Sequence, residues 1–285
     1  MSGKRLSPGQ EGSIGTRDNP VVIVGAGNMG GAIAEALAAS GGAEQLLLVD
    51  PAPNQALHAA LASKGARFAT DASAVRGTSP AVIVLAVKPQ LMAQVASAYA
   101  PFSASALFIS IAAGTTLASL DAWLGHPSAL VRCMPNLPAS IGKGITAGVS
   151  MPGTSSESRT LAERVLGTVG DFIWLDDERQ LDAVTAVSGS GPAYVFHLVE
   201  SLTAAAIRQG LAADVASLLA RRTVEGAGAL LEQSNRSAAE LRKSVTSPGG
   251  TTEAALKVLM DGNRLEELIS KAVAEATRRA TELSK

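Results

Sequence analysis

The chain has 285 residues and a formal net charge of −1, with 47% hydrophobic, 17% charged and 3% aromatic residues. The apolar content is too high for a disordered chain, and the lack of a basic surplus argues against nucleic acid as a partner. The longest uninterrupted apolar run, residues 81–87, is far shorter than the ~20 residues of a membrane helix. These features exclude a nucleic-acid-binding protein and a membrane-spanning one.

Residues 1–20 are polar and rich in Gly and Ser, without the apolar stretch of a signal peptide. We expect a disordered tail there, and a cytoplasmic protein. Cys133 is the one cysteine, so no disulfide can form within the chain. We expect Cys133 to be a buried, unreactive strand thiol, and no His, Asp, Glu or Cys set has the spacing of a metal site.

From residue 21 onwards, apolar strand patterns alternate with Ala/Leu-rich helical patterns. The predicted strands span residues 21–24, 46–49, 81–87, 106–111 and 130–133, and the predicted helices span residues 30–40, 56–63, 91–99 and 117–124. This alternation predicts an α/β domain, with a parallel sheet and helices on both of its faces.

Near residue 178 the pattern changes, and no strand is predicted beyond it. Helical patterns cover residues 179–210, 214–233, 238–244, 252–260 and 265–283. We therefore predict an α/β domain over residues 21–178 and an all-helical domain over residues 179–285. Gly189, Gly191 and Pro192 interrupt the first helical stretch, and we interpret them as a close-packing device with a kink.

A G-x-G-x-x-G motif follows the first predicted strand and opens the first helix, which is the context that this motif needs. Gly25 permits the tight turn, Gly27 lets the backbone approach a pyrophosphate, and Gly30 allows helix and strand to pack closely. Asn28 and Met29 complete the motif, and the helix N-terminus presents N–H groups and a positive dipole end to phosphates. An ordinary glycine-rich turn is the alternative interpretation.

Asp50 lies 20 residues after Gly30, at the end of the second predicted strand. An acidic residue there accepts hydrogen bonds from an adenosine ribose. Its charge also disfavours a 2′-phosphate, which favours the use of NADH. The alternative is that Asp50 caps the turn at Pro51.

Five further stretches have a distinctive order and spacing: residues 86–90, 112–115, 131–138, 182–194 and 245–252. Together they resemble the Δ1-pyrroline-5-carboxylate reductase family, and the resemblance covers residues 21 to about 280. It implies a Rossmann dinucleotide-binding domain followed by an all-α dimerisation domain. It also implies a homodimer with interlocked helical domains, dimers that associate into larger rings, and an active site where a nucleotide domain meets helices of the dimer core.

The implied activity is hydride transfer from NADPH or NADH to the cyclic imine 1-pyrroline-5-carboxylate, which yields L-proline in the last step of proline biosynthesis. The resemblance places residues 86–89 on the nicotinamide ribose and residues 112–114 under the nicotinamide ring. Lys88 could instead be a solvated loop residue. The cofactor-binding residues expected from motif and resemblance are Gly25, Gly27, Asn28, Met29, Gly30, Asp50, Ala86, Val87, Lys88, Pro89, Ala112, Ala113 and Gly114.

The turn at residues 247–252 leads into a helix that begins near Thr251. By resemblance, N–H groups around Gly250 and Thr251 hold the substrate carboxylate, and the Thr252 hydroxyl meets the ring nitrogen as the catalytic group. The expected substrate-binding residues are Ser247, Gly249, Gly250, Thr251 and Thr252. Without the resemblance, the segment is a Pro/Gly turn with a Thr cap.

Other residues leave alternatives open. Asn136 could approach the cofactor or serve a turn, and His197 is expected in the core or an interface, whereas His58 and His126 are expected at the surface. The family often has Asn at Ser73 and Glu near Asn235, and these departures could shift affinity.

Three other functions fit parts of the sequence. A β-hydroxyacid dehydrogenase would need a lysine early in its second domain, and residues 182–242 contain none. A reductase of a cyclic imine with another ring size remains open. A non-enzymatic dinucleotide sensor would not need the 247–252 turn.

Overall fold

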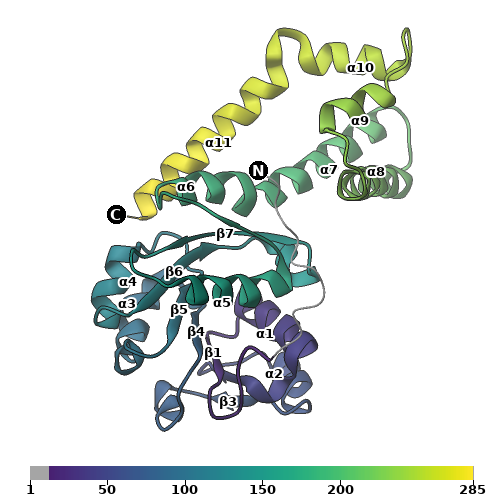
Figure 1. Ribbon diagram of the computed structural model, residues 1–285. Coiled ribbons are helices and arrows are strands. Elements are labelled where there is room, and N and C mark those ends of the chain that lie inside the picture. The colour runs from purple at the N-terminus through teal and green to yellow at the C-terminus, as the bar shows by residue number, and fades with distance from the viewer. Residues whose placement is uncertain (1–12, 285) are drawn as a thin grey trace. The chain divides into compact units, whose positions relative to one another are not determined.

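The computed structural model describes residues 13–284. It divides into two compact units (Figure 1): Met1–Gly189 with Ala276–Lys285, and Ser190–Glu275. Most of the predicted tail lies outside the described residues. Residues 13–20 are described and hydrogen-bonded: the Gly15 N–H donates to Gln45 Oε1 (2.9 Å) and the Ala81 N–H to the Pro20 carbonyl (3.0 Å). The ordered chain therefore reaches back before the first strand.

The first unit is built on one eight-stranded sheet with the order β3-β2-β1-β4-β5-β6-β7-β8. Strands β1 to β6 are parallel, β7 is antiparallel to β6, and β8 is parallel to β7. The strands are β1 Val21–Val24, β2 Leu46–Val49, β3 Arg67–Ala69, β4 Val82–Leu85, β5 Leu107–Ser110, β6 Ala129–Met134, β7 Gly144–Ser150 and β8 Gly170–Trp174.

Helices cover both faces of this sheet, because alternate strand residues point to opposite sides. Val21 and Ile23 belong to one hydrophobic cluster, and Val22 and Val24 belong to the other. The first cluster includes residues of α1 Asn28–Gly41, α2 Gln55–Ala62 and α5 Ser156–Leu166; the second includes residues of α3 Pro89–Ser97, α4 Leu117–Leu124 and α6 Gln180–Val184. The predicted fold class is confirmed.

The order of the strands reverses between β1 and β4, which are neighbours in the sheet. From β1 the chain proceeds outward through β2 and β3, and from β4 it proceeds the other way through β5 and β6. In open α/β sheets, ligands bind at such a switch point, outside the carboxyl ends of the strands. The fold therefore places a ligand-binding position beside the ends of β1 and β4.

The second unit is helical, as predicted: it contains α7 Gly191–Arg208, α8 Ala213–Gln233, α9 Ala238–Ser244, α10 Thr251–Met260 and most of α11 Arg264–Leu283. All of its residues are described, and only Ala216 and Ala220 are buried. Large apolar side chains are exposed instead, among them Phe196 (56%), Leu218 (58%) and Leu268 (65%).

The sequence left three strands and one helix unpredicted. β7, β8 and α5 lie in residues 137–178, for which no element was predicted, and β3 is a three-residue strand. The sheet, which was predicted to be parallel, therefore also contains β7, which is antiparallel to β6. The connection from β6 to β7 is short, because it holds one 3-10 turn (Leu137–Ile141) rather than a crossover helix.

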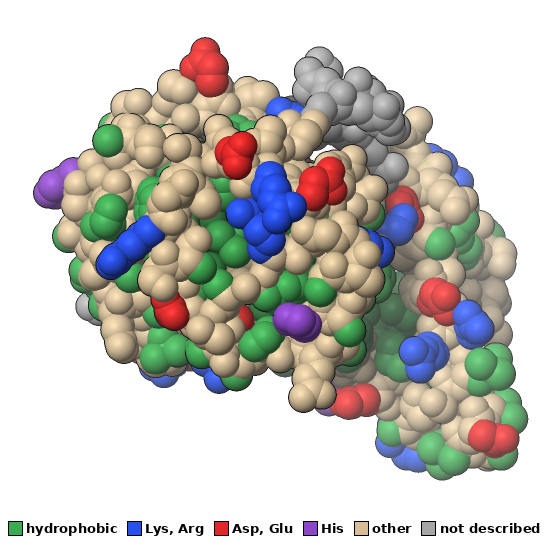
Figure 2. Space-filling view, turned by 90° about the horizontal axis from the view of Figure 1, so that it is seen from below, with side chains coloured by type: hydrophobic (Ala, Val, Ile, Leu, Met, Phe, Trp, Pro, Cys, Tyr) green, Lys and Arg blue, Asp and Glu red, His purple; other side chains and the backbone are tan. Residues whose placement is uncertain are grey.

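The described surface mixes charges of both signs. Figure 2 shows Lys and Arg side chains interspersed with Asp and Glu on the face that it presents. In the described part of the chain, no helix combines the length and apolarity that crossing a bilayer requires.

Candidate functional site

The glycine-rich loop between β1 and α1 has the geometry expected for a dinucleotide. Gly25 has φ +95°, and a Cβ there would lie 2.8 Å from the Ala86 carbonyl oxygen. A Cβ at Gly30 would overlap the Gly25 carbonyl oxygen, so both positions require glycine. Gly27 is exposed, and a side chain there would extend into open space. The loop therefore packs tightly at Gly25 and Gly30 and is open at Gly27.

The N-terminus of α1 has no side-chain cap. Gly27 is the N-cap residue, and no acidic residue lies in the first turn. Exposed N–H groups and the positive end of the helix dipole favour a phosphate at this place. Asn28 is exposed and Met29 is partly buried at the start of the helix.

Asp50 lies beside this loop and holds it. Its Oδ2 accepts the Ala26 N–H (2.7 Å), and its Oδ1 accepts the Ala52 N–H (2.8 Å). The second interpretation from the sequence describes this geometry, because Asp50 caps the turn at Pro51; its contact with an adenosine ribose stays a prediction. Each carboxylate oxygen retains a further lone pair.

The segments after β4 and β5 end at the same edge of the sheet. Ala86 is joined to β1 through its N–H, which donates to the Val24 carbonyl (2.8 Å). Val87 is partly buried, whereas Lys88 and Pro89, at the start of α3, are exposed. Ala112, Ala113 and Gly114 (the 112–114 loop) follow β5, and Gly114 has φ +75°. The structure thus gathers every predicted cofactor residue at the carboxyl ends of β1, β2, β4 and β5.

The predicted substrate turn lies in the second unit, at the start of α10. Gly250 is the N-cap residue without a side-chain cap, and Gly249 has φ +72°. The Gly250 N–H donates to the Ser247 carbonyl (3.0 Å), and the Gly249 N–H donates to Glu253 Oε2 (2.7 Å). These two N–H groups are used inside the turn, so the N–H groups that α10 offers to a ligand begin at Thr251. Thr252 is partly buried.

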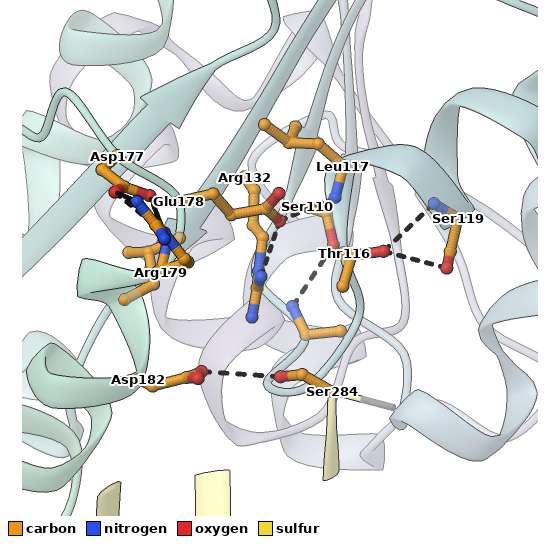
Figure 3. Close-up of polar contacts among 12 residues, drawn as sticks. Ser110, Thr116, Leu117, Ser119, Arg132, Asp177, Glu178, Arg179, Asp182 and Ser284 are labelled. Atoms are coloured by element: carbon orange, nitrogen blue, oxygen red, sulfur yellow. Dashed lines mark hydrogen bonds and ion pairs between the residues drawn. The ribbon is translucent and has the colours of Figure 1, made fainter. Parts of the chain in front are cut away.

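An ion pair between a buried arginine and a partly buried glutamate, near the 112–114 loop, was not assigned a role from the sequence. Arg132, 5% exposed in the middle of β6, donates to Glu178 Oε1 (2.6 Å). The same oxygen accepts the Leu117 N–H (2.7 Å) at the start of α4 (Figure 3). An arginine within an otherwise apolar strand was the available signal, because a buried charge needs a partner.

Several secondary predictions are also resolved. Cys133 is buried, and burial raises the pKa of its thiol. His58 and His126 are exposed, as predicted. His197, which was expected in the core or an interface, is exposed on α7, and its Nδ1 lies 3.0 Å from Glu200 Oε2. Asn136 serves the turn, because its Oδ1 accepts the Ile145 N–H (3.0 Å).

Gly189 lies against the end of the Met134 side chain, whose terminal methyl would be 2.9 Å from a Cβ at this position. It ends a π-helical turn over Thr185–Gly189, and Pro192 lies in the first turn of α7. Among the described residues, no group of three or more His, Cys, Asp or Glu side chains is placed to hold a metal ion.

Comparisons with known proteins agree with this arrangement. A family model described as pyrroline-5-carboxylate reductase dimerisation matches residues 178–283, and one described as NADP oxidoreductase, coenzyme F420-dependent, matches residues 20–114. The pyrroline-5-carboxylate reductase of Pseudomonas aeruginosa is 42% identical over 266 residues, which is 93% of this chain and 96% of that protein. The enzyme of that name from Pisum sativum is 36% identical over 265 residues, 92% of this chain and 95% of that protein.

Solved structures give the same result. A pyrroline-5-carboxylate reductase from Coxiella burnetii is 36% identical with a TM-score of 0.86, covering 94% of this chain and 99% of that chain. A Plasmodium falciparum pyrroline carboxylate reductase with NADP bound is 26% identical with a TM-score of 0.79, covering 95% of this chain and all of that one.

The dinucleotide loop at the switch point and the matched helical dimerisation domain define a two-domain, NAD(P)-dependent oxidoreductase. With the similarity extending over nearly the whole chain, the chain belongs to the pyrroline-5-carboxylate reductase family.

Proposed function

We propose that this chain reduces 1-pyrroline-5-carboxylate to L-proline with NADPH or NADH, the last step of proline biosynthesis. The observation that carries this proposal is the 42% identity to the Pseudomonas aeruginosa enzyme over 93% of the chain. The dinucleotide geometry of the first unit and the 247–252 turn of the second supply the two binding functions that the reaction needs.

The residues of the first unit fit a nicotinamide dinucleotide. The open side of Gly27 and the uncapped start of α1 suit a pyrophosphate, and the carboxylate of Asp50 suits the hydroxyls of an adenosine ribose. Residues 86–89 would contact the nicotinamide ribose, and the small side chains of the 112–114 loop would let the nicotinamide ring lie on the backbone. When bound, NADPH or NADH supplies the hydride.

The 247–252 turn would orient the substrate. The N–H groups at the start of α10, with the positive end of its dipole, suit a carboxylate. Gly250 and Gly249 shape the turn, since their own N–H groups bond to Ser247 and Glu253. This geometry moves the proposed carboxylate contacts from Gly250 towards Thr251 and Thr252.

Thr252 is the proposed catalytic residue. Its hydroxyl oxygen would accept a hydrogen bond from the protonated ring nitrogen, and this contact would hold the electrophilic C=N carbon in position for the hydride, whose addition gives the ring amine. Positioning and fixed dipoles can supply most of such a reaction without a covalent intermediate.

We also propose the domain boundaries and the assembly. Residues 21–178 would bind the dinucleotide, and residues 179–285 would form the dimerisation and substrate domain, in accord with the family model that begins at residue 178. The exposed apolar side chains of α7, α8 and α11 suit burial in an interlocked homodimer, and dimers would associate into a larger ring. The cytoplasmic location stays a prediction.

The test is an assay of the purified chain with 1-pyrroline-5-carboxylate and each cofactor, following the nicotinamide absorbance and identifying the product by chiral chromatography. The proposal expects L-proline in equal amount to the cofactor oxidised. The six-membered analogue serves as the comparison substrate. No oxidation with either cofactor at saturating substrate, or faster turnover of the six-membered imine, would contradict the proposal.

A further inference from the structure

The last turn of α11 is anchored to α6 by one carboxylate, although 99 residues of sequence separate the two groups. Asp182 Oδ2 accepts the hydroxyl of Thr281 at 2.8 Å, which is shorter than the 3.1 Å from that hydroxyl to the Thr277 carbonyl oxygen in its own helix. The Ser284 hydroxyl lies 3.5 Å from Asp182 Oδ1 and 3.1 Å from the Ala280 carbonyl oxygen, so the shorter bond within its own helix is favoured (Figure 3). Thr281 therefore provides the stronger tie.

The position of Asp182 indicates a tertiary role. Its charge is favoured at the N-terminal turn of α6, where it lies. Beside the last turn of α11, however, the carboxylate meets the negative end of a helix dipole, which it does not stabilise. The bond to Thr281 therefore holds α11 in place and does not serve as a cap for that helix.

The end of α11 lies directly on the 112–114 loop. A Cβ at Gly114 would be 2.7 Å from the Leu283 carbonyl oxygen and 3.1 Å from its carbonyl carbon. Gly114 also has φ +75°, a conformation that favours glycine. Ala280, in the same turn of α11, is buried. The backbone of the C-terminal turn thus forms one side of the loop, and only glycine allows this approach.

The exit of the same loop is held by the segment that carries Asp182. Glu178 accepts the Leu117 N–H (2.7 Å) and pairs with the buried Arg132 (2.6 Å). Residues 178–182 therefore hold two neighbours of the 112–114 loop. Glu178 holds the start of α4, which follows the loop, and Asp182 holds the last turn of α11, which lies against Gly114.

We propose that Asp182 is a positioning residue for the cofactor. By holding Thr281, it keeps the last turn of α11 against Gly114, and so fixes the 112–114 loop in the shape that receives the nicotinamide end of NADPH or NADH. This inference rests on the proposed role of the 112–114 loop in cofactor binding. Asp182 and Thr281 act through the loop and contact neither cofactor nor substrate.

The experiment measures the Kd of NADH and NADPH without substrate, by fluorescence titration of the full-length chain. Thr281→Val removes the hydroxyl at nearly constant volume, and Asp182→Ala removes the carboxylate. Each single variant should weaken binding of the preferred cofactor about tenfold, which corresponds to about 1.4 kcal/mol. The double variant should be no weaker than the worse single variant, because the contact that matters for the loop, the Asp182–Thr281 hydrogen bond, is already lost in each single variant.

Matched controls separate positioning from general destabilisation. Thr281→Ser retains the hydroxyl, so this variant should bind the cofactor with the wild-type Kd. Thr160→Val removes a hydroxyl that donates only within α5 in this structure, and Asp214→Ala removes an acidic residue from the first turn of α8. Both controls should leave the Kd unchanged. In steady-state assays the tie variants should raise the KM for the cofactor and leave the KM for the imine within about twofold.

An unchanged Kd in Thr281→Val and Asp182→Ala, or additive effects in the double variant, would overturn the inference. A lowered Tm with an unchanged Kd would also overturn it, because the tie would then be only structural. If the wild-type chain binds the cofactor and the variants weaken that binding, but no imine is reduced, the positioning role stands and the proposed function fails.

Discussion

The two units bury their apolar side chains in opposite ways. Every residue of β1, β2, β4 and β5 is buried, and the sheet is covered on both faces. In the second unit, α7, α9 and α10 bury no residue, while Phe196 and Leu268 are more than half exposed. Apolar side chains therefore form a covered core in one unit and an exposed apolar surface in the other. An exposed apolar surface of this kind marks an interaction site, and the matched dimerisation model makes another copy of the chain its expected partner.

The largest expected effect is on the core of the first unit. Phe108 is fully buried in the centre of the sheet, so Phe108→Ala should lower the free energy of unfolding by about 3–5 kcal/mol, through lost transfer energy and a cavity. Denaturant unfolding followed by circular dichroism measures this change.

Leu268→Ala gives the matched test in the second unit. If no second copy covers the helical unit, this substitution at an exposed position should lower the free energy of unfolding by less than about 0.5 kcal/mol. If a second copy covers Leu268, the cost should rise to about 2 kcal/mol or more, and it should depend on protein concentration. A small loss in Phe108→Ala, or a small and concentration-independent loss in Leu268→Ala, would break the contrast.

The next effect concerns the chemistry assigned to the second unit. Thr252→Ala should lower kcat/KM by roughly 10- to 200-fold, about 1.5–3 kcal/mol, because a hydrogen bond to a charged ring nitrogen is lost. The Kd of the cofactor should not change. Thr160→Ala, on α5 of the first unit, is the control and should match the wild type. An unchanged kcat/KM would remove Thr252 from the site.

A smaller effect concerns cofactor choice in the first unit. Asp50→Ser removes a negative charge beside the glycine-rich loop, so the ratio of kcat/KM with NADPH to that with NADH should rise about tenfold. Asp50→Asn retains an oxygen that can accept the Ala26 N–H, and it therefore separates the loss of charge from the loss of the turn contact. If the ratio stays flat in both variants, Asp50 is a turn residue only.

The smallest effect is an absence of reaction at Cys133. Burial raises the pKa of this thiol, so the reactive thiolate is scarcer than in an exposed cysteine at neutral pH. Alkylation by a maleimide, followed by mass spectrometry, should be slow in the folded chain and fast after denaturation. Labelling of the native chain as fast as of the denatured chain would show that the sheet core opens readily.

The centre of the sheet could be predicted from the sequence, but its edges could not. β1 and β2 are uninterrupted apolar runs with the predicted bounds, because buried parallel strands have that pattern. β7 contains Gly144 and Gly148, which weaken its strand propensity. Gly148 is needed because a Cβ there would collide with Phe172 of the neighbouring strand. The position of β7 in the sheet is therefore determined by its contacts with neighbouring strands and not by the strand propensity of its own residues.

The candidate site shows the same division. Gly25, Gly30 and Asp50 could be predicted because a fixed local motif determines their place. The ties of Glu178 to Leu117 and of Asp182 to Thr281 join residues 61 and 99 positions apart. Such pairs have no local pattern, so only the folded structure shows them.

Sedimentation equilibrium over a wide range of protein concentration tests most directly whether a second copy completes the helical unit. We predict the mass of a dimer, or of a multiple of a dimer, at every concentration at which the chain is folded. The Tm should also rise with protein concentration. A folded, active monomer whose Tm does not depend on concentration would contradict this account.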